Sequence, residues 1–300
     1  MNCETLGRKD TVIPNYWTIG PPDSPVAVEN ADIILPYLPY FLAGWDIRWV
    51  GTSIKGGPDL AVEEYADGSL KVVNSGLRPA DLSFNNSYDA ARSLASELIN
   101  IYCARDPMAT CLRAGAVRID DGLLVLIEDF GLESSNIALH MAVLGYRFFG
   151  DRKIMVLKRG NQVTGTCLGL LPMVRLPLPD DCGDAFREFV HGYSSMQDEN
   201  MAYLKLWDGE AATFGETAPI KAFVILDHMA SGQPVLESTS GSVLIKNAAL
   251  TTTSTEEISP NFWSGLTLPD SGPNFYNLRF SKSLEAAVLL SQELRTASSI

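Results

Sequence analysis

The sequence predicts an α/β protein with a smaller N-terminal α+β region, residues 1–105, and a larger core, residues 106–300. Two observations carry this prediction. Residues 123–127 are a continuous apolar run, typical of a strand buried on both faces, and they lead through a short turn into an amphipathic helix. From Cys111 onwards, strand-like and helix-like segments alternate, which is the pattern of α/β proteins.

The N-terminal region contains two predicted strands and one long helix. The strands are residues 46–50 and 70–73, and turn signals lie at residues 56–58 and 67–68. Residues 87–104 predict a helix because their apolar side chains recur at helical spacing. We identify no chemistry in this region, so its expected role is packing or recognition.

The elements of the core are predicted in order along the chain. A strand at 112–119 turns at 120–122 into the strand 123–127, and the helix 134–144 follows. The later elements are a strand at 146–149, a hairpin of 154–157 and 162–166, a helix at 184–193, strands at 203–207 and 222–226, and a closing helix at 282–295.

Composition restricts the partners that this protein can bind. The chain carries 23 basic and 36 acidic residues, a formal net charge of -13, which argues against nucleic acid and anionic membrane as partners. Its five cysteines form no C-x-x-C pair and are expected to be reduced thiols of a cytoplasmic protein. No signal peptide is expected, and the longest apolar run, residues 33–45, is too short to span a bilayer.

The segment 123–136 has the frame of a phosphate-binding loop, because an apolar strand runs through a turn into a helix. A working P-loop reads G-x-x-x-x-G-K-[ST]. Its glycines let backbone N–H groups surround the phosphates, and its lysine reaches the β- and γ-phosphates. Here Glu128 and Glu133 hold the two glycine positions, and Ser134 holds the lysine position. The frame is therefore present while most of its chemistry is missing.

The degenerate Walker A loop, Glu128 to Asn136, retains three candidate nucleotide-binding residues: Gly131, Ser134 and Ser135. Side chains at the former glycine positions fill space that phosphates need, and glycine's freedom to adopt positive φ is lost with them. A carboxylate about 4 Å from a phosphate oxygen costs about 1 kcal/mol in water and about 4 at an effective dielectric constant of 20. Ordinary ATP binding is therefore disfavoured.

Three stretches of the core carry a resemblance to a known family. They read ALHMAVLGYRFFGD at 138–151, GLLPMVRLP at 169–177 and FGETAPI at 214–220. With the strand and loop before them, they resemble the HPr kinase/phosphorylase-like family of P-loop phosphotransferases over about the last two-thirds of the chain. The resemblance implies a P-loop phosphotransferase-like core, a serine kinase ancestry with ATP and Mg²⁺ as cofactors, and homo-oligomerisation.

The departures from this family fall on its functional positions. A histidine of the family corresponds to Arg113. The family's two consecutive aspartates serve magnesium and the activation of the attacking hydroxyl; Asp151 keeps the first, and Arg152 replaces the second. In an active protein, the resemblance would make Asp151 catalytic and place Mg²⁺ on Ser135 and Asp151. Loss of the loop lysine removes a cation that neutralises charge on the transferred phosphoryl group.

Charged residues around the loop allow two interpretations each. Glu128, Asp129 and Glu133 form either a solvated acidic turn that favours the helix dipole or a divalent-cation site. Arg152 and Lys153 either substitute for the missing lysine or pair with the loop acids across the strand ends. We expect Arg152 and Lys153 to pair with the loop acids, and we expect the three acids to form a solvated turn.

The three histidines give no metal site. His140 lies in the middle of the predicted helix on its apolar side and is expected to be a packed core residue. His191 and His228 have no cysteine or carboxylate at a recognised ligand spacing.

Three functional hypotheses follow. The first is a pseudokinase, an HPr-kinase-like protein that acts by binding a protein partner. The second is an active ATP-dependent protein serine kinase that uses Asp151 with Arg152 or Lys153. The third is a domain that binds another small ligand or a metal in the vacated cleft.

Overall fold

The computed structural model describes residues 13–74, 83–128, 133–159, 162–242 and 272–297. The chain forms two compact units, Met1–Arg105 and Asp106–Ile300. Both units combine strands and helices, so the predicted α/β class is confirmed. Within the described ranges, no helix is both long and apolar enough to cross a membrane.

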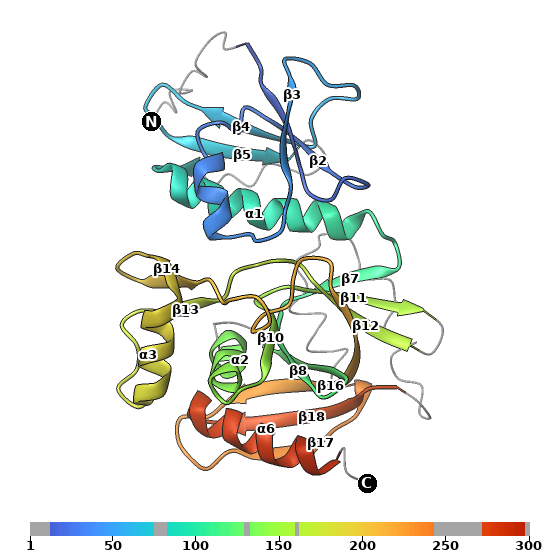
Figure 1. The fold of residues 1–300 in the computed structure, drawn as a ribbon, viewed down its shortest axis with the longest axis vertical. Coiled ribbons are helices and arrows are strands. Elements are labelled where there is room, and N and C mark those ends of the chain that lie inside the picture. Colours follow the sequence, from blue (N-terminus) through green and yellow to red (C-terminus); the bar gives the residue numbers. More distant parts are fainter. Residues whose placement is uncertain (1–12, 75–82, 129–132, 160–161, 243–271, 298–300) are drawn as a thin grey trace, which may run out of the picture. The chain divides into compact units, whose positions relative to one another are not determined.

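The first unit is built on a six-stranded sheet with the order β3-β1-β2-β4-β5-β6 (Figure 1). β2 and β4 run parallel, and the other neighbouring pairs are antiparallel. The strands are β1 (Tyr16–Ile19), β2 (Val26–Glu29), β3 (Ile47–Gly51), β4 (Leu60–Glu64), β5 (Leu70–Asn74) and β6 (Ser83–Phe84), and a 3-10 helix, η1 (Leu35–Tyr40), lies between β2 and β3.

One long helix, α1 (Ser87–Ala104), completes the first unit and confirms the predicted helix at 87–104. The side chain of Asn86 accepts a hydrogen bond of 2.8 Å from the backbone N–H of Asp89, which caps the first turn. The helix buries one apolar face, made of Ala90, Ala91, Leu94, Ala95, Leu98, Ile99 and Cys103.

The second unit contains a nine-stranded mixed sheet in which β10-β8-β9-β16-β12-β11-β7 are neighbours, β18 pairs with β16, and β17 pairs with β18. β9, β16 and β18 are parallel to one another, whereas β8 and β9 form an antiparallel hairpin. The strands are β7 (Ala109–Leu112), β8 (Ala114–Ile119), β9 (Gly122–Ile127), β10 (Arg147–Gly150), β11 (Ile154–Arg159), β12 (Gln162–Cys167), β16 (Thr217–His228), β17 (Val235–Ser238) and β18 (Asn274–Phe280). A small separate sheet contains β13 (Met173–Arg175), β14 (Ser194–Gln197) and β15 (Met201–Leu204).

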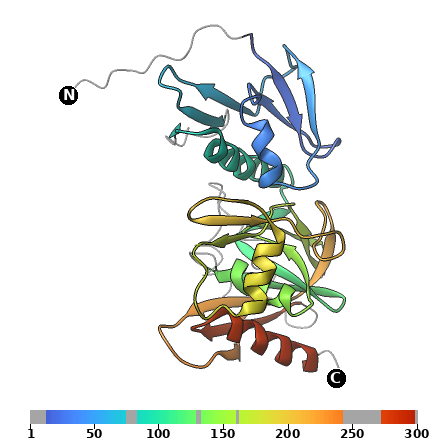
Figure 2. The ribbon, with the colours of Figure 1, turned by 60° about the vertical axis from the view of Figure 1, so that its left-hand side comes forward.

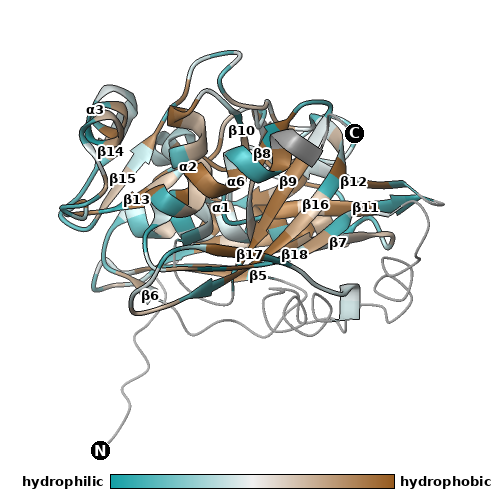
Figure 3. Ribbon diagram, turned by 90° about the horizontal axis from the view of Figure 1, so that it is seen from below, coloured by the Kyte–Doolittle hydropathy of each residue, from teal (hydrophilic) through white to brown (hydrophobic). Residues whose placement is uncertain are grey.

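Two helices, α2 (Glu133–Val143) and α6 (Ser283–Ala297), cover one face of the large sheet, and α3 (Asp184–Tyr193) packs against α2 and β15. Their buried side chains join alternate residues of β8, β9, β16 and β18 in one core, and α2 lies between α3 and α6 (Figure 1 and Figure 2). Side chains from the opposite face of β8, β9 and β16 pack with those of β7, β11 and β12. β9 is buried at every position, and Figure 3 shows the hydrophobic colour gathered on β9 and β16.

Most sequence-based elements are confirmed, and three predicted strands are wrong in extent. The predicted strand 222–226 is only the middle of β16, which extends from Thr217 to His228. The predicted strand 112–119 is two strands, because β7 pairs with β11 while β8 pairs with β9 and β10, and the chain changes neighbours at Arg113. The predicted strand 203–207 ends at Leu204, since β15 pairs only with β13 and β14. Four of the five cysteines are described, and all four are buried free thiols.

Candidate functional site

The candidate site lies where β9 ends and α2 begins. β9, β16 and β18 are parallel, so their carboxyl ends share one edge of the sheet, the edge where ligands bind in open α/β proteins. Glu128 follows β9 directly, and α2 starts at Glu133. Gly131 and Asp129, two residues named from the sequence, lie outside the described residues.

Glu128 contacts the amino end of α2 with its own carboxylate. Its Oε2 accepts a hydrogen bond of 2.8 Å from the backbone N–H of Ser134, and the residue is only 4% exposed. Such first-turn N–H groups are the ones that bind phosphate at a helix N-terminus. The carboxylate of Glu128 therefore takes up a donor that a phosphate would need.

Burial raises the pKa of Glu128, and the hydrogen bond from Ser134 and the charge of Arg113 only partly oppose this effect. The second oxygen, Oε1, has no hydrogen-bond partner in the part of the chain that the structure describes. The predicted solvated acidic turn is therefore wrong for Glu128, because this side chain is buried against the helix. Glu133 is half-buried, and its Oε2 accepts a hydrogen bond of 2.8 Å from Ser283 Oγ.

The first turn of α2 packs tightly against β8. Ser134, which holds the lysine position of a P-loop, is fully buried, and its Oγ has no partner among the described residues. A Cβ placed on Gly115 of β8 would lie 2.7 Å from the carbonyl oxygen of Ser134. Only glycine fits there, so strand and helix backbones approach more closely than any side chain at 115 allows.

Asp151 is the centre of a buried polar network. It is fully buried, and Ser135 donates its hydroxyl hydrogen bond to Oδ1. Its Oδ2 accepts hydrogen bonds from Arg152 Nε, at 2.8 Å, and from the backbone N–H of Met173, at 3.2 Å. Burial raises the pKa of Asp151, while Arg152, Ser135 and Met173 favour its charged form. Both carboxylate oxygens are therefore used inside the protein.

Arg152 pairs with Asp151 and not with Glu128 or Glu133, so for Arg152 the predicted pairing with these two loop acids is wrong. Its backbone has a φ of 56°, and its guanidinium also donates to the carbonyl oxygen of Leu171 at 3.3 Å. Lys153 is buried, with 8% of its surface exposed.

The residues that the structure describes at this edge fit neither a nucleotide phosphate nor Mg²⁺ in the family's manner. A phosphate would meet the carboxylate of Glu128 at the start of α2, and Ser135 and Asp151 bind each other. No group of three or more His, Cys, Asp or Glu side chains in the described ranges is placed to hold a metal ion. The sequence named Ser134, Ser135 and Asp151, but it missed Gly115 and the backbone of Met173. The small-residue run Ala114-Gly115-Ala116 was the available signal for the former.

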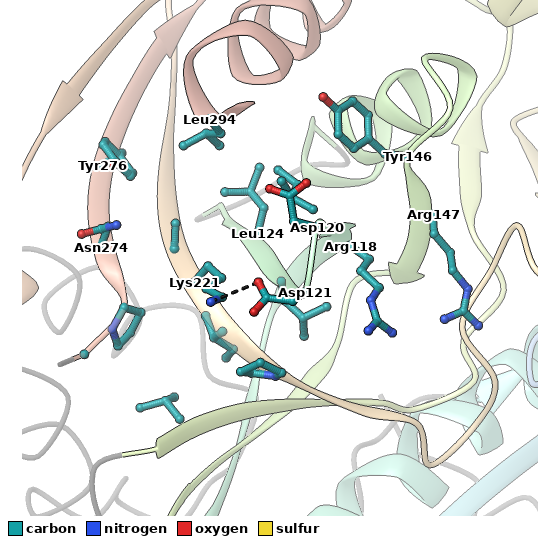
Figure 4. A pocket seen from close by; sticks show the side chains of 18 of the residues that line it. Arg118, Asp120, Asp121, Leu124, Tyr146, Arg147, Lys221, Asn274, Tyr276 and Leu294 are labelled. Carbon is teal, nitrogen blue, oxygen red and sulfur yellow. Dashed lines mark ion pairs between the residues drawn. The ribbon is translucent and has the colours of Figure 1, made fainter. Parts of the chain in front are cut away.

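A hollow of about 1470 Å³ lies at the opposite edge of the sheet, where β9, β16 and β18 begin. Figure 4 shows its charged lining, with Lys221 Nζ 3.1 Å from Asp121 Oδ1. Arg147, another lining residue, is held by Glu216, whose pKa is lowered by that hydrogen bond. The amino ends of parallel strands are not where ligands bind in this class of sheet.

The chain matches no protein-family model and no curated protein sequence. Among solved structures, it is similar to the HPr(Ser) kinase/phosphatase from Coxiella burnetii. The identity is 11%, the TM-score is 0.33, and the similarity covers 63% of this chain and 96% of the other. The identity and the TM-score are too low for this similarity to assign a function.

Proposed function

We propose that this protein is an HPr-kinase-like pseudokinase: a P-loop phosphotransferase-like core without phosphotransfer, which acts by binding a protein partner. One observation carries the proposal. The carboxylate of Glu128 is hydrogen-bonded to the backbone N–H of Ser134, at the helix terminus where a P-loop binds phosphate. A strand is followed by a helix, as in a P-loop protein, but a backbone donor at the start of the helix is bonded to a carboxylate of the protein itself.

Electrostatics supports the absence of nucleotide binding. Two like charges about 4 Å apart repel by about 1 kcal/mol in water and about 4 at an effective dielectric constant of 20, and the site of Glu128 is buried. The N-terminus of a helix stabilises a nearby negative charge by about 0.3–1 kcal/mol. Ser134, at the lysine position, supplies no compensating cation.

The state of Asp151 also disfavours an active kinase. A general base must lie within hydrogen-bond reach of the proton that it takes from the substrate. Ser135 and Arg152 occupy one oxygen of Asp151 each, and the residue has no exposed surface. The same residues that the resemblance assigns to catalysis therefore stabilise the fold.

An exposed aromatic cluster on the second unit supports protein binding. Trp207 is 70% exposed, and its ring packs edge-on against Tyr193 with centroids 5.5 Å apart. Glu210 fixes this pair, since its carboxylate accepts hydrogen bonds from Tyr193 Oη at 2.6 Å and from the backbone N–H of Trp207 at 3.0 Å. Exposed Trp and Tyr side chains held in place are frequent anchors of protein interfaces.

The first test is a thermal-shift titration with ATP, GTP and ADP, each with and without Mg²⁺. A ligand at about 100 times its dissociation constant stabilises the fold by about 2.7 kcal/mol, which gives a readable shift. We expect no shift for the wild type. The isosteric variant Glu128→Gln removes the buried charge and shows whether that charge is what excludes nucleotides. A Mg²⁺-dependent shift of the wild type that disappears in Asp151→Asn would contradict the pseudokinase and support the active kinase.

The second test concerns the partner. Proteins retained by the wild type from cells of its source should be lost with Trp207→Ala. The matched control is Trp49→Ala, because Trp49 is also well exposed, at 62%, but belongs to the first unit. Equal retention by both variants would contradict the role of the Trp207 cluster, and retention of a second copy of the chain would identify the partner as a homo-oligomer.

A further inference from the structure

β3 forms one edge of the sheet in the first unit. It is the last strand in the order β3-β1-β2-β4-β5-β6, and among the strands that the structure describes it pairs only with β1. Its residues 48–50 are exposed. The strand at the other edge, β6, has only two residues. β3 is therefore the longer edge of this sheet, and a further strand can add to an exposed edge of this kind.

The backbone of β3 directs hydrogen-bonding groups away from the sheet. The backbone N–H of Gly20, the residue after β1, donates to the carbonyl oxygen of Asp46 at 2.9 Å, so Asp46 directs its backbone toward β1. In an antiparallel pair this direction alternates along the strand. Arg48, opposite Thr18 of β1, therefore also faces β1, whereas the backbone N–H and C=O groups of Ile47 face the open edge.

Two opposite charges flank Ile47. Asp46 and Arg48 form an ion pair of 2.6 Å, and their side chains are 53% and 58% exposed. Because side chains alternate between the faces of a strand, the two lie on the same face of the sheet. Charges on an edge strand commonly prevent pairing, since they repel the same charge on a second copy. Here, however, an antiparallel copy brings each charge to its opposite.

The charges select one register for such a pairing. With Ile47 opposite the same residue of a second copy, each Asp46 lies opposite an Arg48 of the other chain, at non-hydrogen-bonded positions where side chains approach most closely. With Ile47 opposite residue 49, the two Arg48 side chains would face each other, and like charges directly opposite destabilise a strand pair. With the two residues at position 49 opposite each other, Arg48 faces Val50 and gains no charged partner.

We propose that this chain binds a second copy of itself through β3, in an antiparallel arrangement centred on Ile47 that joins the two six-stranded sheets into one. The contact has twofold symmetry, so the same residues meet on both sides, and two ion pairs between Asp46 and Arg48 connect the chains. β3 belongs to the first unit, so the proposed dimer does not depend on the pseudokinase proposal, which concerns the second.

The proposed contact is small. One pair of short strands buries less surface than the about 1,200–2,000 Å² of stable interfaces, so we expect a weak dimer with a dissociation constant of about 0.1 mM. In dilute experiments, such as retention of proteins from a lysate or urea denaturation, the chain is then a monomer.

The test is analytical ultracentrifugation of the full chain at concentrations from about 5 µM to about 500 µM. We expect the mean mass to rise with concentration from 32.7 kDa, the mass of one chain, toward twice this value. Arg48→Glu should keep the mass of one chain, because acidic side chains then face each other at both ion pairs. Asp46→Arg should do the same, because basic side chains then face each other. Both positions are more than half exposed, so both variants are expected to fold.

Mixing the two variants tests the register itself. In a pair made of one Arg48→Glu chain and one Asp46→Arg chain, every acidic side chain faces a basic one. An equimolar mixture should therefore associate, although neither variant does so alone. The double variant Asp46→Arg/Arg48→Glu exchanges the two charges and should dimerise as the wild type does.

Arg92→Glu is the matched control. It makes the same change of charge in α1, where Arg92 pairs with Asp89 at 3.0 Å, and it should dimerise as the wild type does. The proposal is overturned if the wild type keeps the mass of one chain at every concentration. It is also overturned if Arg48→Glu dimerises as Arg92→Glu does, which would place the contact on another surface, or if the mixture of the two variants does not associate.

Discussion

Asp151 and Arg152 form a buried ion pair in which each partner compensates the charge of the other. Removing one partner of such a pair leaves an uncompensated charge and costs about 3–5 kcal/mol. We therefore expect Asp151→Asn to lower the free energy of unfolding by an amount in this range, measured by urea denaturation. Asp151→Asn combined with Arg152→Leu should cost less than the sum of the single changes, because neither charge is then left alone.

The matched control is the pair Asp46–Arg48 of the first unit, which also joins an Asp to an Arg, at 2.6 Å, but has both side chains more than half exposed. Exposed pairs contribute about 0–1 kcal/mol, so Asp46→Asn should change little. If Asp151→Asn lowers the free energy of unfolding no more than Asp46→Asn does, the carboxylate of Asp151 has no structural role. The hypothesis of an active kinase would then be favoured.

His140 predicts a pH dependence of stability. The pKa of His140 is about 6.5 in the unfolded chain and about 4 in the folded protein, so the unfolded state binds the proton first as the pH falls. Stability from this residue is complete above pH 6.5 and is lost between pH 6.5 and pH 4. A difference of one unit between the folded and unfolded pKa values corresponds to about 1.4 kcal/mol, so the free energy of unfolding falls by about 3 kcal/mol.

Urea denaturation of the wild type and of His140→Phe at several pH values measures this loss. The difference between the two proteins isolates His140 from the other groups that titrate in the same range. A constant difference from pH 7 to pH 4 would contradict the prediction.

At the scale of elements, the close approach of β8 and α2 makes Gly115 the most sensitive glycine of the site. A Cβ at this position would lie 2.7 Å and 2.9 Å from the backbone O and C atoms of Ser134, so α2 must shift to accept it. We expect Gly115→Ala to destabilise the protein by about 1–3 kcal/mol, measured by thermal or urea denaturation. Gly192→Ala, in α3, is the control, because a Cβ there meets open space and replacing glycine in a helix gains up to about 1 kcal/mol. Equal effects of the two changes would contradict the close packing of β8 on α2.

The elements that the sequence predicted well are those whose signals are local. The helix at 87–104 was found because its apolar residues repeat at helical spacing, and β9 was found because an uninterrupted apolar run is typical of a strand buried on both faces. The strand at 112–119 failed because its pattern continues through Arg113 while its neighbours change. β18 was missed because its polar residues interrupt the apolar pattern of a strand. It is a strand because it pairs in parallel with β16.

The site was predicted in its residues and missed in its contacts. Sequence spacing brought Glu128 and Ser134 together as parts of one loop motif. It gave no indication that the carboxylate of Glu128 would be buried and bonded to the helix that follows it. Ser135 and Asp151 are 16 residues apart, and only the packing of α2 beside β10 makes them partners. Side-chain contacts of this kind depend on tertiary packing, which residue patterns do not contain.

At the scale of the whole molecule, each of the two units has its own buried core. Leu94 of α1 is fully buried in the first unit, and Leu126 of β9 is fully buried in the second. Domains with separate cores unfold as separate cooperative units, so calorimetry of the full chain should resolve two transitions. Replacing a buried leucine by alanine costs about 2–5 kcal/mol. We therefore expect Leu94→Ala to lower one transition and Leu126→Ala to lower the other. If either variant moved both transitions by the same amount, the two units would share one cooperative core, and a ligand bound in the second unit would then stabilise the first as well.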